Sequence, residues 1–235
     1  MDIIKVDYSS NLKFDKEVVA VLGQFDGLHI GHVQLIEAAK KEAKLNDQKV
    51  AIFTFDPHPD YVLNKRDYNG YLTPLPKKLE LLQELAVDYV VLIHFDIALS
   101  RLSPDDFHKR FLSCVNTIVV GSDYRYGFKG QGNTLSLRQA GKKVISFDLL
   151  KHDNKKIGSN TIRELLMAGE VDKIYLLLNH YYNITGVVRH GSKVGRTMGI
   201  RTANIDLVEE YQIIKKGVYV VYVNIDNKRY LGVCN

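Results

Sequence analysis

Residues 23–32 read Gly23-Gln-Phe-Asp-Gly-Leu-His29-Ile-Gly-His32. The run before them, residues 18–22, is uninterrupted in its apolarity and rich in β-branched residues, which is typical of a strand covered on both faces. The segment after them, from Val33 onward, contains strong helix formers with apolar residues at helical spacing. The sequence therefore predicts a strand, a glycine-containing turn and a helix in succession.

This turn has the composition of a phosphate-binding site. The start of a helix offers unpaired backbone N–H groups and the positive end of the helix dipole, and His29 and His32 add two possible donors. Glycines in the turn allow close approach of a ligand to the backbone. Two other interpretations stay open from these residues alone: half of a metal site, or two histidines that cap loop groups. No cysteine or third ligand lies nearby in the sequence to complete a zinc set.

Composition indicates an ordinary globular protein. The chain has 235 residues, 46% of them hydrophobic and 25% charged, and no apolar run approaches the roughly 20 residues that span a bilayer. The first residues lack the form of a signal peptide, so we expect a cytoplasmic protein without a membrane contact. The net charge of +5 suits nucleotides, but it is spread along the chain, which disfavours a nucleic-acid partner. Cys114 and Cys234 form no motif, and Cys114 is expected in the core.

Strand-like and helical segments alternate through the first part of the chain, which predicts an α/β fold with a parallel, doubly wound sheet. A leucine stripe over residues 76–85 predicts one helix, and Ser103 is the expected N-cap of another. After about residue 181 the segments are short, β-type and separated by glycine. We therefore expect two domains, 1–181 and 182–235. The remaining strands of the first domain are expected at residues 50–55, 89–95, 117–121 and 144–147.

Three further motifs stand at the ends of predicted strands or at a helix start. Thr54-Phe-Asp56-Pro-His58-Pro59 follows the second strand, and Gly121-Ser-Asp123-Tyr124-Arg-Tyr126-Gly127 follows the fourth. Ligands of open α/β sheets gather at such carboxyl ends. Ile157-Gly-Ser159-Asn160-Thr-Ile-Arg163 opens a helix, where hydroxyl groups serve for capping or for phosphate contact, and arginine is a good phosphate ligand. A rigid turn, aromatic packing and simple capping are the alternative interpretations of the three motifs.

In this order the four motifs resemble GxFDGxHxGH, FDPHP, VGxDFRFG and ISSTxIR of the bacterial riboflavin kinase/FMN adenylyltransferase family, within the HxGH nucleotidyltransferases. Tyrosine replaces both phenylalanines of the third motif, and Gly158 and Asn160 depart from the fourth. The resemblance implies a Rossmann-like nucleotidyltransferase domain that forms FAD and pyrophosphate from FMN and ATP, with Mg²⁺. It implies catalytic roles for His29, His32, Arg163 and Ser159, ATP contacts for Gly23, Phe25, Gly31 and Asn160, and flavin contacts for Asp56, His58, Asp123, Tyr124 and Tyr126.

Residues 186–205 resemble the start of the family's riboflavin kinase module, in which a PTAN segment binds magnesium and ATP. Thr202 and Asn204 match that segment, but Arg201 stands where the proline belongs. The family continues beyond the position of Asn235 through further strands that carry the kinase's glutamate. We therefore expect an incomplete β-barrel-type module without riboflavin kinase activity, whose unpaired strand edges favour a homo-oligomer.

Several alternatives remain at this stage. The chain is bifunctional if it is a fragment of a longer enzyme. A second alternative is that the chain is another kind of HxGH nucleotidyltransferase, one that adenylylates nicotinamide mononucleotide or cytidylylates a small phosphate. A truncated second module also fits a non-catalytic flavin-binding or regulatory protein.

Overall fold

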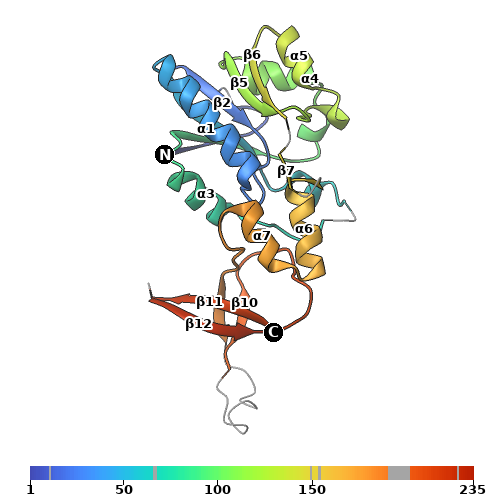
Figure 1. Ribbon diagram of the computed structural model, residues 1–235. Coiled ribbons are helices and arrows are strands. Elements are labelled where there is room, and N and C mark those ends of the chain that lie inside the picture. The colour runs from blue at the N-terminus through green and yellow to red at the C-terminus, as the bar shows by residue number, and fades with distance from the viewer. Residues whose placement is uncertain (11, 66–67, 149, 153–154, 190–201, 227) are drawn as a thin grey trace.

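Six parallel strands form the central sheet of the computed structural model, which describes residues 1–235 except 11, 66–67, 149, 153–154, 190–201 and 227 (Figure 1). The order across the sheet is β1-β4-β3-β2-β5-β6. The five expected strands are present. Strand β1 was not predicted, because its mostly exposed side chains lack the apolar pattern of a buried strand. The strands are β1 (Asp2–Val6), β2 (Val18–Leu22), β3 (Lys49–Asp56), β4 (Tyr89–His94), β5 (Thr117–Gly121) and β6 (Lys143–Phe147).

Helices and helical turns connect the strands. Ser103 is the N-cap of α4, as expected, and its hydroxyl accepts a hydrogen bond from the N–H of Asp106. The helices are α1 (Ile30–Leu45), α2 (Pro59–Val62), α3 (Leu75–Glu84), α4 (Pro104–Phe107), α5 (Thr134–Gln139), α6 (Ser159–Ala168) and α7 (Val171–Leu178), with short turns η1 (Leu99–Arg101) and η3 (Phe128–Gly130) and a π-helical turn η2 (His108–Leu112).

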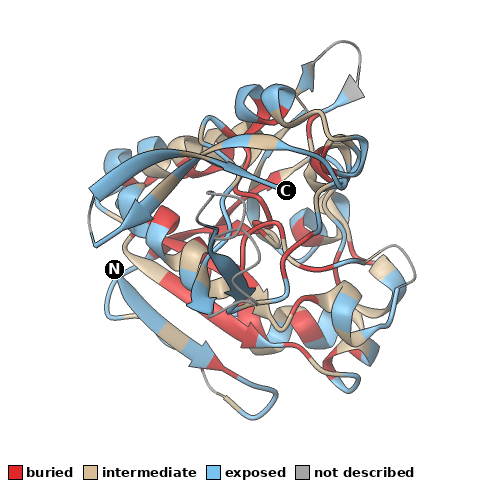
Figure 2. Ribbon diagram, turned by 90° about the horizontal axis from the view of Figure 1, so that it is seen from below, coloured by how far each residue is buried: buried red, intermediate tan, exposed pale blue. Residues whose placement is uncertain are grey.

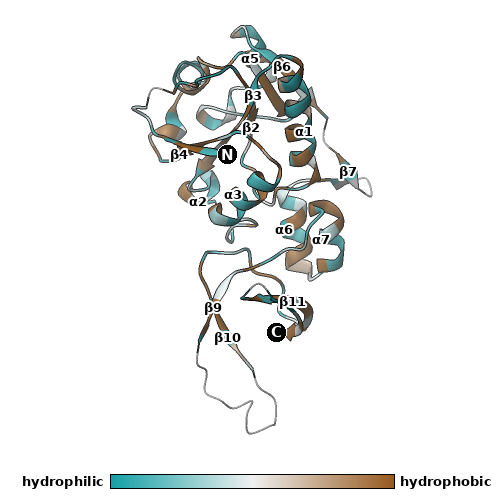
Figure 3. Cartoon of the chain, turned by 90° about the vertical axis from the view of Figure 1, so that its left-hand side faces the viewer, coloured by the Kyte–Doolittle hydropathy of each residue, from teal (hydrophilic) through white to brown (hydrophobic). Residues whose placement is uncertain are grey.

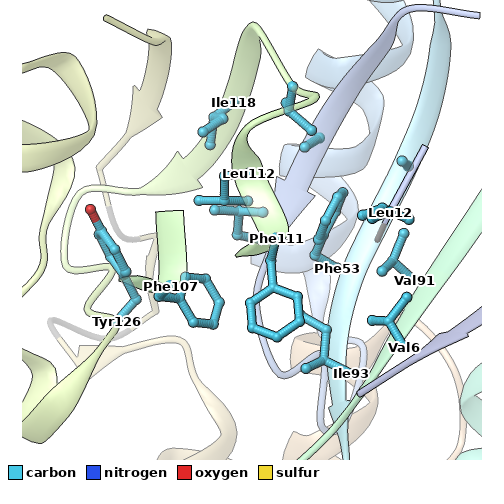
Figure 4. Packing of buried hydrophobic residues seen from close by; sticks show 14 of the residues in the cluster. Val6, Leu12, Phe53, Val91, Ile93, Phe107, Phe111, Leu112, Ile118 and Tyr126 are labelled. Atoms are coloured by element: carbon cyan, nitrogen blue, oxygen red, sulfur yellow. The ribbon is translucent and has the colours of Figure 1, made fainter. Parts of the chain in front are cut away.

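Two apolar layers cover the sheet. Alternating side chains of β2, β3 and β4 pack on one face against α1 and α3. The opposite face packs against α4 and η2, and Figure 4 shows Phe107, Phe111 and Leu112 gathered near Phe53 and Ile93. Both faces of β2 are buried, so the prediction of a doubly covered strand is confirmed, and buried residues run through the centre of the molecule (Figure 2).

The strand order places a switch point between β2 and β5. The chain moves from β2 through β3 to β4 on one side of β2, and then returns to place β5 on its other side. Connections on the two sides of such a point leave a crevice beyond the carboxyl ends of the strands, where ligands of open α/β sheets bind. The turn that contains His29 and His32 follows β2 directly, so the topology puts it at this crevice.

Two details of the helices differ from expectation. Cys114 is exposed, because it follows η2 in a turn and does not face the sheet. In α3 the buried side chains are Lys78, Leu81 and Leu82, so a lysine lies on the apolar face of the helix. None of the helices in the described residues is long and apolar enough to cross a membrane.

The β-rich region after α7 forms two small antiparallel sheets. β9 (Gly186–Arg189) pairs with β10 (Asn204–Leu207), and β11 (Tyr219–Ile225) pairs with β12 (Lys228–Cys234). Both lie beyond α6 and α7, away from the six-stranded sheet, and a third small sheet joins β7 (Lys151–His152) to β8 (Lys155–Lys156) (Figures 1 and 3). Apolar side chains of β11 and β12 are exposed, for example Val220 at 76%. The described strands do not close into a barrel, so the expected barrel-type module is not confirmed.

Candidate active site

The turn between β2 and α1 is tightly coiled. Phe25, Gly27 and Leu28 all have positive φ angles, of 52°, 88° and 42°. A Cβ on Gly27 would lie 3.2 Å from Leu72, so glycine suits this position in both backbone angle and space. The coil directs the chain into α1 with His29 as the N-cap residue, although the His29 side chain makes no capping hydrogen bond. The first turn of α1 therefore faces the carboxyl end of the sheet.

His29 and His32 form a stacked pair at the start of α1. Their ring centroids lie 3.7 Å apart with an interplanar angle of 18°, and Phe25 packs on His32 at 5.0 Å. Each Nδ1 atom is buried and has no hydrogen-bond partner among the described residues. A buried polar atom without a partner costs free energy, so the pair favours a polar ligand. A Cβ on Gly31 would come 3.1 Å from His29 Nδ1, so this glycine keeps one side of the pair open.

Both imidazoles are neutral near pH 7. Burial, and then the charge of Lys156, lower the pKa of His29 to about 4, although Asp26 and Asp123 oppose this shift. Burial, followed by His29 and Lys78, holds the pKa of His32 well below its ordinary value. A neutral imidazole donates from one ring nitrogen and accepts at the other. The pair can therefore donate hydrogen bonds to phosphate oxygens without carrying two adjacent charges.

Asp26 holds the turn to the rest of the domain. Its carboxylate is buried, and Oδ1 accepts hydrogen bonds from the N–H groups of Leu72 and Thr73, both at 3.0 Å. Oδ2 lies 2.6 Å from Nη2 of Arg163 in a buried ion pair. The Ser159 hydroxyl donates to the main-chain oxygen of Asp26 at 2.7 Å. Arg163 and Ser159, for which the resemblance implies catalytic roles, thus fix the turn from α6.

Lys78 approaches the same turn from α3. Its side chain is 2% exposed, and Nζ donates to the carbonyl oxygen of Gln24 at 2.8 Å. Burial lowers the pKa of Lys78 to about 8, while Asp26 and Asp56 favour the charged form. The site consequently contains two buried cations, Lys78 and Arg163, beside one fully buried carboxylate.

His58 comes to Asp26 from the end of β3. Its Nε2 lies 4.0 Å from Asp26 Oδ2, and its Nδ1 accepts a hydrogen bond from the N–H of Asp60. Burial lowers the pKa of His58 to about 4, against the opposing effect of Asp26. Asp56 is partly buried at the last position of β3, so both polar residues of the expected FDPHP motif stand at the crevice edge.

The motif after β5 divides between surface and core. Asp123 is exposed and forms an ion pair with Lys156, and both charges act on His29. Tyr124 is partly buried and stacks on Tyr126 with centroids 5.9 Å apart. Tyr126 lies in the core, where its hydroxyl is 3.1 Å from Ser136 Oγ. Of the three residues predicted to contact flavin here, Asp123 and Tyr124 are thus at least partly exposed, whereas Tyr126 is buried.

The remaining predicted residues are one glycine bonded to the sheet and three exposed residues. The Gly23 N–H belongs to the sheet and donates to Phe53 O at 3.1 Å. Asn160 is exposed in the first turn of α6, beside Ser159. Thr202 and Asn204 are exposed next to and within β10. Arg201 lies outside the described residues.

Pattern reasoning missed three residues of the site: Asp26, Lys78 and Gln212. Asp26 stands within the first motif, where a carboxylate between apolar residues of a buried turn needs a partner. The signal for Lys78 was its spacing of three and four from Leu81 and Leu82, which puts a charge on an apolar helix face. Gln212 accepts from Arg163 Nη1 at 2.6 Å, and it carries no local signal.

Acidification is expected to destabilise the fold through the three neutral histidines, His29, His32 and His58. Unfolded histidine has a pKa near 6.5, so below that pH the unfolded chain binds protons that the folded chain excludes. The free energy of unfolding should fall between pH 6.5 and 4, by at most about 4 kcal/mol per pH unit for three protons. Urea unfolding at pH 7, 6 and 5 measures the slope.

The variant His58→Gln isolates one proton of this effect. It should reduce the slope by at most about 1.4 kcal/mol per pH unit. The same replacement at His94, an exposed residue at the end of β4, is the control for the loss of a histidine outside the site. Equal slopes for His58→Gln and the unmodified chain would contradict the assignment of a neutral, buried His58.

Two protein-family models match different parts of the chain. The family model described as FAD synthetase matches residues 11–163, and the one described as riboflavin kinase matches residues 178–235. The bifunctional riboflavin kinase/FMN adenylyltransferase of Listeria monocytogenes is 38% identical over 227 residues, which cover 94% of this chain and 72% of the relative. The chain belongs to this family.

A second relative and a solved structure are also similar to this chain. The bifunctional riboflavin kinase/FMN adenylyltransferase of Bacillus subtilis is 35% identical over 225 residues, which cover 92% of this chain and 71% of the relative. A crystal structure titled as a macrolide-efflux protein from Streptococcus pneumoniae matches with a TM-score of 0.90 and 27% identity, over 99% of this chain and 78% of that one. The fold therefore recurs in a solved structure.

Membership of the family confirms the expected enzyme class, a nucleotidyltransferase of FAD biosynthesis. It also changes one expectation. Because both family models match and the relatives are named as bifunctional, the comparisons support the bifunctional alternative better than a chain without kinase function. The roles of individual residues are not tested by the comparisons and stay predictions.

Proposed function

We propose that this chain transfers the adenylyl group of ATP to FMN, producing FAD and pyrophosphate. The observation that carries the proposal is the stacked, neutral His29–His32 pair, whose buried Nδ1 atoms lack partners at the start of α1 and at the switch point of the sheet. A helix start beside two neutral donors is suited to the phosphates of a nucleotide. The family relation supplies the two substrates.

The reaction needs no protein nucleophile. An oxygen of the FMN phosphate attacks the α-phosphorus of ATP in line, the new O–P bond forms, and the bond to the β-phosphate oxygen breaks to release pyrophosphate. The protein then contributes positioning and stabilisation of the negative charge on the transferring and departing phosphates. His29 and His32 would donate to these oxygens, while Lys78 adds a positive charge behind the turn.

Arg163 and Ser159 would contact the β- and γ-phosphates from α6. Arginine has five N–H donors, and three hydrogen bonds tie Arg163 to Gly70, Gln212 and Asp26, so donors remain for a ligand. Asn160 is exposed in the same helical turn and would add an amide to the ATP side. On the flavin side, Asp123 and Tyr124 would bind the ring system, with Asp56 and His58 nearer the reacting phosphates.

Magnesium would enter with ATP. The described residues contain no group of three or more His, Cys, Asp or Glu side chains that could hold a metal ion. Magnesium commonly uses substrate phosphates, water and only one or two carboxylates, and the exposed carboxylate of Asp123 fits such a role. Bound there, the ion would neutralise charge on the phosphates.

Riboflavin phosphorylation is the second candidate function, because the riboflavin kinase model matches residues 178–235. Thr202 and Asn204 are exposed and would serve its nucleotide. The first site would then use the FMN that the second region makes.

Product analysis tests both proposals. The chain is incubated with ATP, magnesium and either FMN or riboflavin, and the products are separated by chromatography. FAD and pyrophosphate from FMN are expected, and FMN from riboflavin would support the second candidate. Parallel incubations with nicotinamide mononucleotide, and with CTP and a small phosphate, test other acceptors. Flavin binding without pyrophosphate release would contradict the proposed reaction.

A further inference from the structure

Residues 210–215 of the β-rich region lie against the nucleotidyltransferase region and are bonded to it along the main chain. The Tyr71 N–H donates to Glu210 O at 2.7 Å, and the Gln212 N–H donates to Tyr71 O at 2.8 Å. The Lys215 N–H donates to Leu166 O in α6 at 2.9 Å. The two bonds of Tyr71 form a short parallel bridge between Tyr71 and Tyr211. The contact is therefore ordered like a strand pair, and it joins segments about 140 positions apart in sequence.

The contact is close enough to require glycine on one side. Gly70 has a φ angle of +108°, and a Cβ there would lie 2.6 Å from both the carbonyl carbon and the oxygen of Tyr211. No side chain fits at that separation. The first region is thus shaped to receive residues 210–215.

Gln212 connects this contact to the candidate active site. Its side chain is 2% exposed, and Oε1 accepts from Arg163 Nη1 at 2.6 Å. Its own carbonyl oxygen accepts from the Tyr182 hydroxyl at 2.8 Å. Because the main chain is held on both sides, the amide oxygen has a fixed position from which to orient the guanidinium.

The orientation of Arg163 continues to the histidine turn. Nη1 donates to Gly70 O and to Gln212, while Nη2 donates to Asp26 Oδ2. Asp26 lies three residues before His29 and is also bonded to Ser159. Gln212, Gly70 and Asp26 thus supply the three acceptors that fix the guanidinium.

We infer that Gln212 is a positioning residue for the ATP-phosphate site, supplied by the region that matches the riboflavin kinase model. It orients Arg163, and through Arg163 it holds Asp26 and the turn. This inference rests on the proposed function for the identity of the ligand. It implies that the β-rich region contributes to adenylyl transfer.

Three variants test this inference. Gln212→Met keeps side-chain length and removes the acceptor, Gln212→Glu retains an acceptor oxygen, and Gln139→Met makes the control replacement at an exposed position in α5. Steady-state FAD formation from FMN is measured well below each variant's melting temperature. Binding of ATP alone is measured by calorimetry, independently of turnover.

Gln212→Met should lower kcat/KM for ATP about tenfold and raise the Kd of ATP about tenfold, since a hydrogen bond to a charged group is lost. The KM for FMN should not change, Gln212→Glu should recover most of the loss, and Gln139→Met should behave like the unmodified chain. A purely structural role would lower the melting temperature of Gln212→Met with kcat/KM and Kd unchanged, which would overturn the inference.

The two readouts separate this inference from the proposed function. If the unmodified chain binds ATP but makes no FAD, the proposed function fails, and the Kd values still decide the role of Gln212. If the unmodified chain binds no ATP, both are overturned.

Discussion

Asp26→Asn is expected to lower the free energy of unfolding by about 3–5 kcal/mol, the usual cost of breaking a buried ion pair by removing one partner. The amide retains an oxygen for the N–H groups of Leu72 and Thr73, so the change is mainly one of charge. Arg163 and Lys78 would then be two buried cations without a fully buried carboxylate beside them. Urea denaturation at pH 7 measures the loss.

A matched pair in the β-rich region provides the control. Arg189 Nε lies 2.6 Å from Asp206 Oδ2, the same separation as in the Arg163–Asp26 pair, but both side chains are at least half exposed. Solvent screens such a pair, so Asp206→Asn should cost less than about 1 kcal/mol. If Asp26→Asn and Asp206→Asn lowered the free energy of unfolding by the same small amount, the buried network around Asp26 would not be what stabilises the turn.

The strands of the sheet were predictable because burial on both faces leaves a clear signature. Residues 18–22 and 117–121 were expected as strands and were found with those bounds. Strand β1 was not predicted because it lies at the edge of the sheet, where only its residue Val6 is buried. Cys114 was wrongly placed in the core, since an apolar neighbourhood in sequence does not show where η2 ends.

The candidate site was predictable to the level of motifs, but its internal bonds were not. Strand ends converge in a parallel sheet, so His29, His58 and Asp123 could be expected at one edge. The pairing of Arg163 with Asp26 joins residues 137 positions apart, and the bond to Gln212 spans 49. Such bonds depend on how α6 and residues 210–215 pack, which local pattern and spacing do not encode.

Arg163 shows what this difference means for mechanism. From the sequence it is a free cation at a helix start, available to phosphate. In the structure it is 8% exposed and bonded to three groups, so its position is fixed before any ligand arrives. A preorganised charge need not reorient during the reaction, and this increases its effect on a transition state.

His32→Ala is expected to reduce kcat for FAD formation by about 10²- to 10³-fold, the range found when one preorganised donor is removed from an active site. The ring is partly buried, stacks on His29 and packs at a tilt against Phe25, so its loss should lower the free energy of unfolding by no more than about 2 kcal/mol. The two quantities are measured on the same preparation, by product analysis with FMN and by urea unfolding.

His94→Ala is the matched control, because His94 is an exposed histidine at the end of the nearby strand β4. It should leave FAD formation unchanged. If the chain phosphorylates riboflavin, that rate should also survive in His32→Ala, since Thr202 and Asn204 lie in a different region of the chain. FAD formation near the unmodified rate in His32→Ala would remove the histidine pair from the mechanism. If kcat and the free energy of unfolding fell together, the histidine pair would have a structural role only. A catalytic donor lowers kcat by more than its effect on stability explains.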